Sequence, residues 1–117
     1  MKTNRLILIL ALTLDLRPVA FAQAKTFRGE IMDSPCAAMG SHEQMMKAEK
    51  ARNARECTLA CIKAHGALVL YDAANKKVYK LDDQVKPKTF AGKKVMVTGE
   101  YDDALKTFRL RSIKAAR

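Results

Sequence analysis

Hydrophobic and polar residues alternate in the chain directly after residue 24. The segment KTFRGEIMD (25–33) places Phe27 and Ile31 on one face, with Gly29 as a kink between them, which predicts a β-strand. The DSP tripeptide (33–35) is expected to end that strand. The predicted domain therefore begins with a strand that buries one of its two faces.

The second half of the chain predicts two β-hairpins. ALVLY (67–71) and KVYKL (77–81) form the first, and KVMVTGEY (94–101) and TFRLRSI (107–113) form the second. Between the hairpins, DDQVKPKTFAG (82–92) predicts a capped turn or a short helix. The inward positions of all five strands predict one core: Phe27, Ile31, Leu68, Leu70, Tyr79, Leu81, Val95, Val97, Phe108 and Leu110.

A polar, Ala-rich stretch separates the first strand from the hairpins. Ser41 with Gln44 and Asn53 with Glu56 are two capping-box signals. They predict helices near 42–52 and 54–65.

This order of elements is typical of a mainly β fold. We expect an OB-like five-stranded antiparallel barrel with a helical hairpin inserted after the first strand. The barrel would be a single domain, 25–117, and the insert would be 36–65. An antiparallel sheet with helices packed on one face is the alternative.

The N-terminal residues predict a secretory signal peptide. Lys2 and Arg5 give a basic start, and the apolar run from Leu6 to Leu14 is too short to cross a bilayer. Small residues in an A-x-A pattern predict cleavage after Ala22 or Ala24. With 1–24 as a signal peptide, the protein is expected to be exported, periplasmic or secreted, with no transmembrane segment.

The chain is strongly basic, with a formal net charge of +10. Removal of the signal peptide lowers this to +8. For an exported protein, such a charge favours anionic envelope polymers or a protein partner over nucleic acid. A weaker hypothesis is an oligonucleotide- or polyanion-binding barrel, with basic side chains beside the three tyrosines, Tyr71, Tyr79 and Tyr101. Its polyanion candidates are Arg28, Lys80, Arg109 and Arg111.

All three cysteines lie in the predicted insert, close to both histidines and half of the six methionines. Cys57 and Cys61 are four residues apart, so they share one face of a helix. In an oxidising compartment, a disulfide from Cys36 to either of them would brace the insert. A Cys57–Cys61 bridge is disfavoured, because Cβ atoms at i and i+4 on a helix lie about 5–6 Å apart. One thiol would remain unpaired.

The same residues also suggest a metal site. Cys36, His42, Cys57 and Cys61 together would give zinc a Cys₃His tetrahedron. Soft donors nearby would suit copper(I) instead. The weaker candidates of this kind are His65, Met39, Met45 and Met46. We expect that no cofactor is needed, with zinc or copper as the alternative.

Several segments resemble a family of small exported bacterial proteins to which no activity is assigned. These segments are TFRGEIMDSPC, GSH, ECTLACIKAHGALVLYD, KVYKLDDQ and FAGKKVMVTGEYD. The positions that match the Cys/His pattern of that family are Cys36, His42, Cys57 and Cys61. More distantly, AGKKVMVTG and the strand after it resemble the closing hairpin of bacterial OB-fold envelope proteins. The resemblance implies export and an OB-like barrel, and it implies no catalytic residues.

No sequence pattern of a common catalytic site occurs in the chain, including G-x-S-x-G, H-E-x-x-H and a P-loop. We therefore expect no enzymatic activity. The expected function is an exported, non-catalytic binding or envelope stress-protective module with a disulfide-braced helical insert. Zinc or copper binding at the Cys/His cluster is the alternative.

Overall fold

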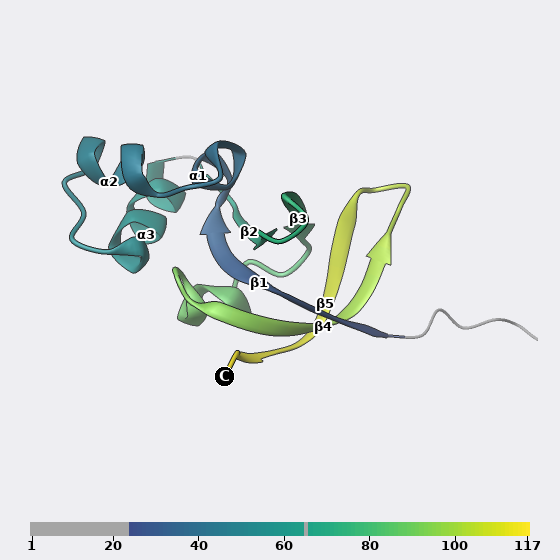
Figure 1. Ribbon diagram of the computed structural model, residues 1–117. Coiled ribbons are helices and arrows are strands. Elements are labelled where there is room, and N and C mark those ends of the chain that lie inside the picture. Colours follow the sequence, from purple (N-terminus) through teal and green to yellow (C-terminus); the bar gives the residue numbers. More distant parts are fainter. Residues whose placement is uncertain (1–23, 65) are drawn as a thin grey trace, which may run out of the picture.

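The computed structural model describes residues 24–64 and 66–117, so the predicted signal peptide lies outside the described residues except for Ala24, and His65 also lies outside them. The described residues form a mainly β structure (Figure 1). Its strands are β1 (Lys25–Asp33), β2 (Leu68–Asp72), β3 (Lys77–Leu81), β4 (Lys94–Asp102) and β5 (Thr107–Ala115). Its helices are α1 (Ser34–Met39), α2 (Glu43–Ala48), α3 (Ala54–Ala64) and the short 3₁₀ helix η1 (Lys86–Phe90).

The five strands form one mixed sheet that closes in a ring, in the order β1-β2-β3-β5-β4. The prediction that all strands are antiparallel was wrong for one pair, because β3 and β5 run parallel. The reason is the odd number of strands. Directions cannot alternate all the way around a ring of five, so at least one neighbouring pair must be parallel. The predicted hairpins, β2–β3 and β4–β5, are both antiparallel.

Strand β1 belongs to both halves of the ring. Its first part, from Lys25 to Glu30, pairs with β4, and its last part, from Glu30 to Asp33, pairs with β2. Gly29 lies directly before the residues of β1 that pair with β2. A Cβ atom at this position would lie 2.5 Å from the carbonyl oxygen of Tyr71, which is too close for any side chain. The lack of a side chain therefore lets β1 contact both neighbours at the bend.

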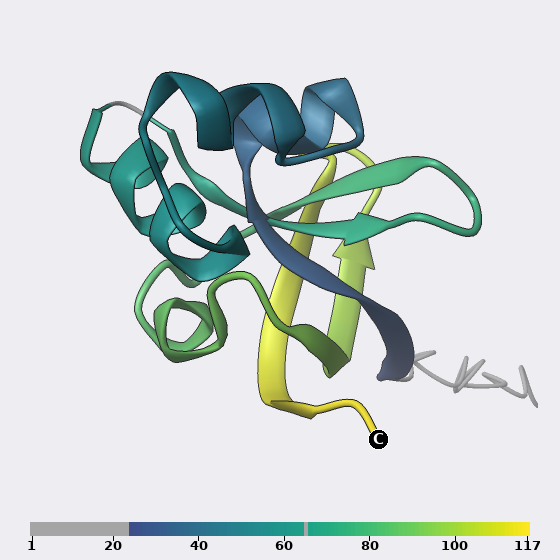
Figure 2. The ribbon, with the colours of Figure 1, turned by 60° about the vertical axis from the view of Figure 1, so that its left-hand side comes forward.

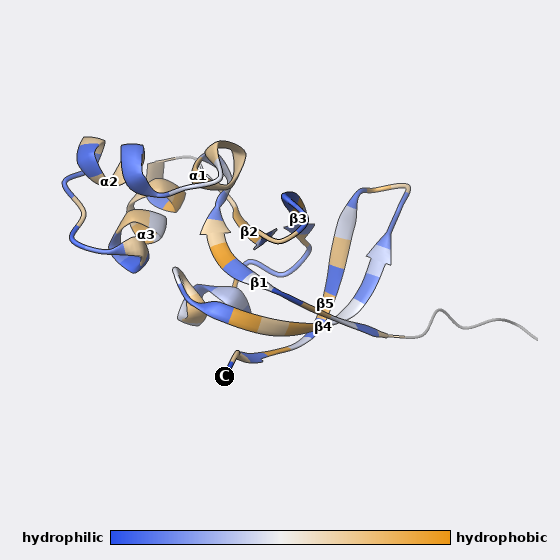
Figure 3. Ribbon diagram, in the orientation of Figure 1, coloured by the Kyte–Doolittle hydropathy of each residue, from blue (hydrophilic) through white to orange (hydrophobic). Residues whose placement is uncertain are grey.

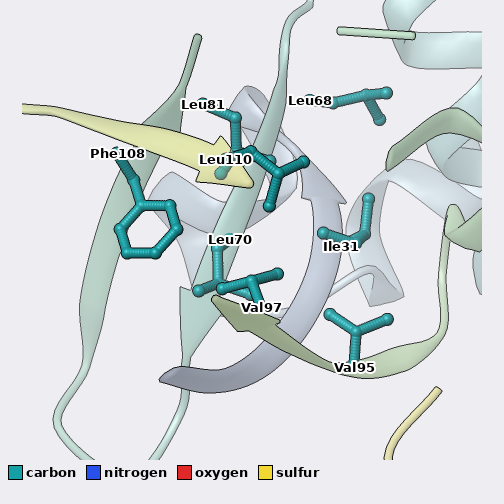
Figure 4. Packing of buried hydrophobic residues seen from close by; sticks show 8 residues of the cluster. All are labelled: Ile31, Leu68, Leu70, Leu81, Val95, Val97, Phe108 and Leu110. Carbon is teal, nitrogen blue, oxygen red and sulfur yellow. The ribbon is translucent and has the colours of Figure 1, made fainter. Parts of the chain in front are cut away.

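The interior of the ring is filled by the predicted core. Eight of the ten predicted residues form one buried cluster, and Phe27 and Tyr79 pack against it partly buried. Figure 4 shows the eight side chains converging between the strands. In Figure 3, the strongly hydrophobic residues of β1 and β4 lie in the middle of each strand, between hydrophilic residues. The alternation read from the sequence thus identified the inward face of every strand correctly.

The helices gather on one side of the ring, at the end where β1 finishes (Figures 1 and 2). The two predicted helices correspond to α2 and α3, although α2 is shorter than expected. The backbone N–H of Glu56 bonds to the Asn53 side chain at 2.9 Å, as the capping signal predicts. Helix α1 was not predicted. It begins directly after β1, because Asp33 caps it and Pro35 occupies its first turn.

None of the helices in the described part of the chain is long and apolar enough to cross a membrane.

Candidate metal centre

Four buried side chains meet between the end of β1 and the helices: Asp33, Cys36, Cys57 and Cys61. One oxygen or sulfur atom of each lies within 4.8 Å of those of the other three. Asp33, Cys36 and Cys57 are 0% exposed, and Cys61 is 3% exposed. The set is therefore a deeply buried group of three thiols and one carboxyl.

Three elements position these side chains. Asp33 is the last residue of β1 and the N-cap of α1, and its Oδ2 accepts a hydrogen bond from the backbone N–H of Cys36 at 2.9 Å. Cys57 and Cys61 are one turn apart on α3, and both are on its buried side. The strand end and two short helices thus direct their donor atoms to one point.

An apolar layer surrounds the group. Met32, Ala37 and Val69 are buried in the same cluster as the three cysteines, and Met45 and Met46 pack against it. This layer keeps water away, which strengthens electrostatic interactions inside it.

The environment disfavours thiolates in the absence of a cation. Burial raises the pKa of Cys36 and of Cys57, and it raises the pKa of Cys61 to about 12. The nearby Asp33 carboxyl adds to the rise at Cys36 and Cys61. A cation bound between the sulfurs would reverse this balance, because metal coordination deprotonates a thiol.

One atom of the group is left without a partner. Asp33 Oδ1 is buried and has no hydrogen bond within the described residues. An unpaired buried carboxylate oxygen costs folding free energy, and natural structures rarely leave one unsatisfied. A metal ion at the group would supply the missing interaction.

The sulfur positions fit a tetrahedral ion. Cys36 Sγ and Cys57 Sγ lie 3.8 Å apart. Zn–S bonds of about 2.3 Å at tetrahedral angles place neighbouring sulfurs about 3.8 Å apart, so this edge of the site needs no adjustment. A disulfide requires about 2.05 Å between the sulfurs, so the two side chains would have to approach each other. The cysteines are free in this structure.

The structure separates His42 from the cysteines it was predicted to join. His42 Nε2 lies 2.8 Å from Oε2 of Glu30, on β1. His42 is not a member of the group that Asp33 forms with the three cysteines. His42 is therefore part of a different contact, and the fourth donor beside the three thiols is Asp33.

The weaker metal candidates are also spread out. Met39 is 44% exposed, whereas Met45 and Met46 pack against the cysteine cluster as partly buried apolar residues. His65 lies outside the described residues.

Sequence reasoning missed Asp33, although the sequence carries a signal for it. An Asp that precedes Ser-Pro is typical of an N-cap with a proline in the first turn. The same tripeptide also predicts the end of a strand, and β1 does end there. In a helix capped by Asp33, Asp33 and Cys36 are neighbours across the first turn.

Two of the predicted polyanion-binding residues already have acidic partners. Arg109 lies 3.5 Å from Asp102, and Arg111 bonds to Glu100. The Tyr79 ring contacts both Phe27 and Tyr101, with centroids 5.3 and 5.5 Å apart, whereas Tyr71 packs against the cysteine cluster. The described structure therefore does not combine the three tyrosines and the arginines into one free basic and aromatic surface.

Comparison with known proteins identifies no relative. No protein-family model, no curated protein and no solved structure matches this chain.

Proposed function

We propose that the protein is a small exported, non-catalytic binding module in which a bound zinc ion links the helices to the β-ring. Asp33, Cys36, Cys57 and Cys61 would hold the ion. The observation that carries this proposal is the convergence of three thiols and one carboxyl in one buried group. One oxygen of that carboxyl is buried without a hydrogen bond among the described residues. A buried site with four protein donors is typical of structural zinc, whereas catalytic zinc keeps one open position.

The donor set favours zinc over copper. Thiolates suit both Zn²⁺ and Cu(I), but a carboxylate oxygen is a common ligand of zinc and a poor one for soft Cu(I). The methionines that would favour copper lie around the group as packing residues.

The burial of the thiols also supports a non-catalytic role. A cysteine nucleophile needs an accessible thiolate with a lowered pKa. Here the thiols are inaccessible and their pKa values are raised.

Export and the OB-like fold belong to the same proposal. The support for export is the N-terminal sequence pattern and the resemblance to small exported bacterial proteins. The support for an OB-like fold is a closed ring of five strands, with a Greek-key order and a helical segment between β1 and β2. Envelope polymers remain the expected partners because of the basic charge.

A disulfide from Cys36 to Cys57 is the competing role for the same residues. The 3.8 Å between their sulfurs makes this the favoured pair if the protein is oxidised. It would leave Cys61 as a free buried thiol.

Metal titration with single variants tests the proposal. Reduced protein should bind one zinc ion per chain, and cobalt(II) in its place should give the absorption bands of tetrahedral thiolate coordination. Cys36→Ser, Cys57→Ser and Cys61→Ser should each weaken binding. His42→Ala is the matched control, because His42 faces Glu30, and it should leave zinc affinity unchanged.

The competing outcomes are distinct. If a structural zinc ion holds the helices in place, a chelator lowers the melting temperature and a reductant does not. A protein that carries no metal, shows one disulfide by intact mass and is destabilised by reductant would refute the zinc proposal.

A further inference from the structure

A cavity separate from the thiol group lies along β1. It has a volume of about 710 Å³, within the range typical of small-molecule sites. Its walls come from the middle of β1, the loop after α1, the turn between β2 and β3, and the last residues of the chain. None of the four proposed zinc ligands lines it.

Much of the wall is apolar. Met32, Met46 and Tyr71 contribute to it, from β1, α2 and β2. A ligand that fills the cavity would therefore need an apolar body.

The acidic groups at the cavity already have partners. Hydrogen bonds or an ion pair hold each of these carboxylates, although an amide partner leaves the carboxylate charge in place. The three pairs are Glu30 with His42 at 2.8 Å, Glu43 with Lys47 at 3.8 Å, and Asp72 with the Asn75 side chain at 2.7 Å.

Three basic groups at the cavity remain unpaired. Among the described residues, no carboxylate lies within 4.0 Å of the side-chain nitrogens of Arg28, Lys94 or Arg117. Arg28 is two residues from Glu30 on β1, and Lys94 lies opposite Glu30 on β4. Residues at i and i+2, and residues directly opposite across a strand pair, share one face of a sheet. Both cations are therefore on the face that borders the cavity.

The pair of His42 and Glu30 helps to form this site. The His42 side chain is 12% exposed, and it fixes the loop after α1 against β1 through its bond to Glu30. Gly40, in the same loop, ends α1 with a φ of 72°, which favours glycine. The loop is thus held in place without a ligand, as in a pre-formed pocket.

We infer that this cavity binds a small organic anion, a carboxylate with an apolar body, whose charged end meets Arg28 and Lys94. The apolar wall selects the body, and Arg28 and Lys94 select the charge. The inference does not depend on zinc, since it uses other residues.

The inference is tested by measuring the binding of decanoate to the full protein with calorimetry and NMR. Decanoate should bind saturably at one site per chain and more weakly as salt is added. Decanol, which lacks the charge, and glutarate, which lacks the long apolar body, should both bind more weakly. Reversing both cations, in Arg28→Glu/Lys94→Glu, should weaken decanoate binding about tenfold.

Lys80→Glu is the matched control, because Lys80 is exposed on β3 and does not line the cavity. It should leave the affinity unchanged. Arg28→Gln/Lys94→Gln should give a smaller loss than the charge reversal, and circular dichroism should show that each variant folds. The inference is overturned if decanoate does not bind saturably, if decanol binds as tightly, or if the charge reversal has no larger effect than Lys80→Glu.

Discussion

The carboxylate of Asp33 accepts the backbone N–H of Cys36 at 2.9 Å through Oδ2, while its Oδ1 is buried and has no hydrogen bond among the described residues. One side chain therefore caps α1 and offers an oxygen to the proposed zinc site. These two roles can be separated by substitution.

Asp33→Asn should keep the cap and lose the ligand. An amide oxygen can still accept the Cys36 N–H, so the metal-free protein should keep its helix content. Zinc affinity should fall at least about tenfold, because the anionic ligand is gone. Competition with a chromogenic chelator measures this. Equal zinc affinity in the variant and the wild type would show that Asp33 is only a helix cap.

The interior of the ring should not tolerate a charge. Val97 is 0% exposed in the main core cluster, so Val97→Asp would bury an unpaired carboxylate and should unfold the domain. Arg109, on the same sheet, is exposed, and Arg109→Gln should change the free energy of unfolding by no more than about 1 kcal/mol. Urea unfolding compares the two. Similar losses at both positions would contradict the assigned faces of β4 and β5.

Gly29 should resist even the smallest side chain. A Cβ atom there would meet the Tyr71 carbonyl oxygen at 2.5 Å and the Leu70 side chain at 2.9 Å. We expect Gly29→Ala to cost about 1–3 kcal/mol, as overpacking against a fixed backbone does. The reverse substitution at an exposed position, Ala73→Gly, should change the free energy of unfolding only slightly. Thermal unfolding of both variants measures the difference, and a stable Gly29→Ala protein would show that β1 can move away from β2.

The strands and their core could be predicted because each strand buries one face. Apolar and polar residues therefore alternate along the strand. That signal is local, so it also identified both hairpins. The parallel pairing of β3 with β5 is not local, and it follows only from closing five strands into a ring. For the same reason the sequence predicted the cysteines of the site and not its fourth member. Cys57 and Cys61 are linked by helical periodicity, whereas the choice between Asp33 and His42 depends on how α1 and the loop after it fold.

The raised pKa values of the thiols predict how the metal-free protein responds to alkali. Burial, with the Asp33 carboxyl nearby, raises the pKa of Cys61 from 9.0 to about 12. In the unfolded chain this thiol loses its proton near pH 9, whereas in the folded protein it keeps the proton up to about pH 12. Its contribution to stability is therefore fully present below pH 9 and is lost as the pH rises from 9 towards 12.

Urea unfolding of reduced, chelator-treated protein between pH 8 and pH 11 measures this loss. The Cys61→Ala variant is the control, since it keeps every other titratable group of the wild type. The wild type should lose stability more steeply, by up to about 1.4 kcal/mol per pH unit for each such thiol. With zinc bound, the thiols are already deprotonated, so the extra slope should disappear. If wild type and Cys61→Ala show the same alkaline slope without metal, the buried position of Cys61 is wrong.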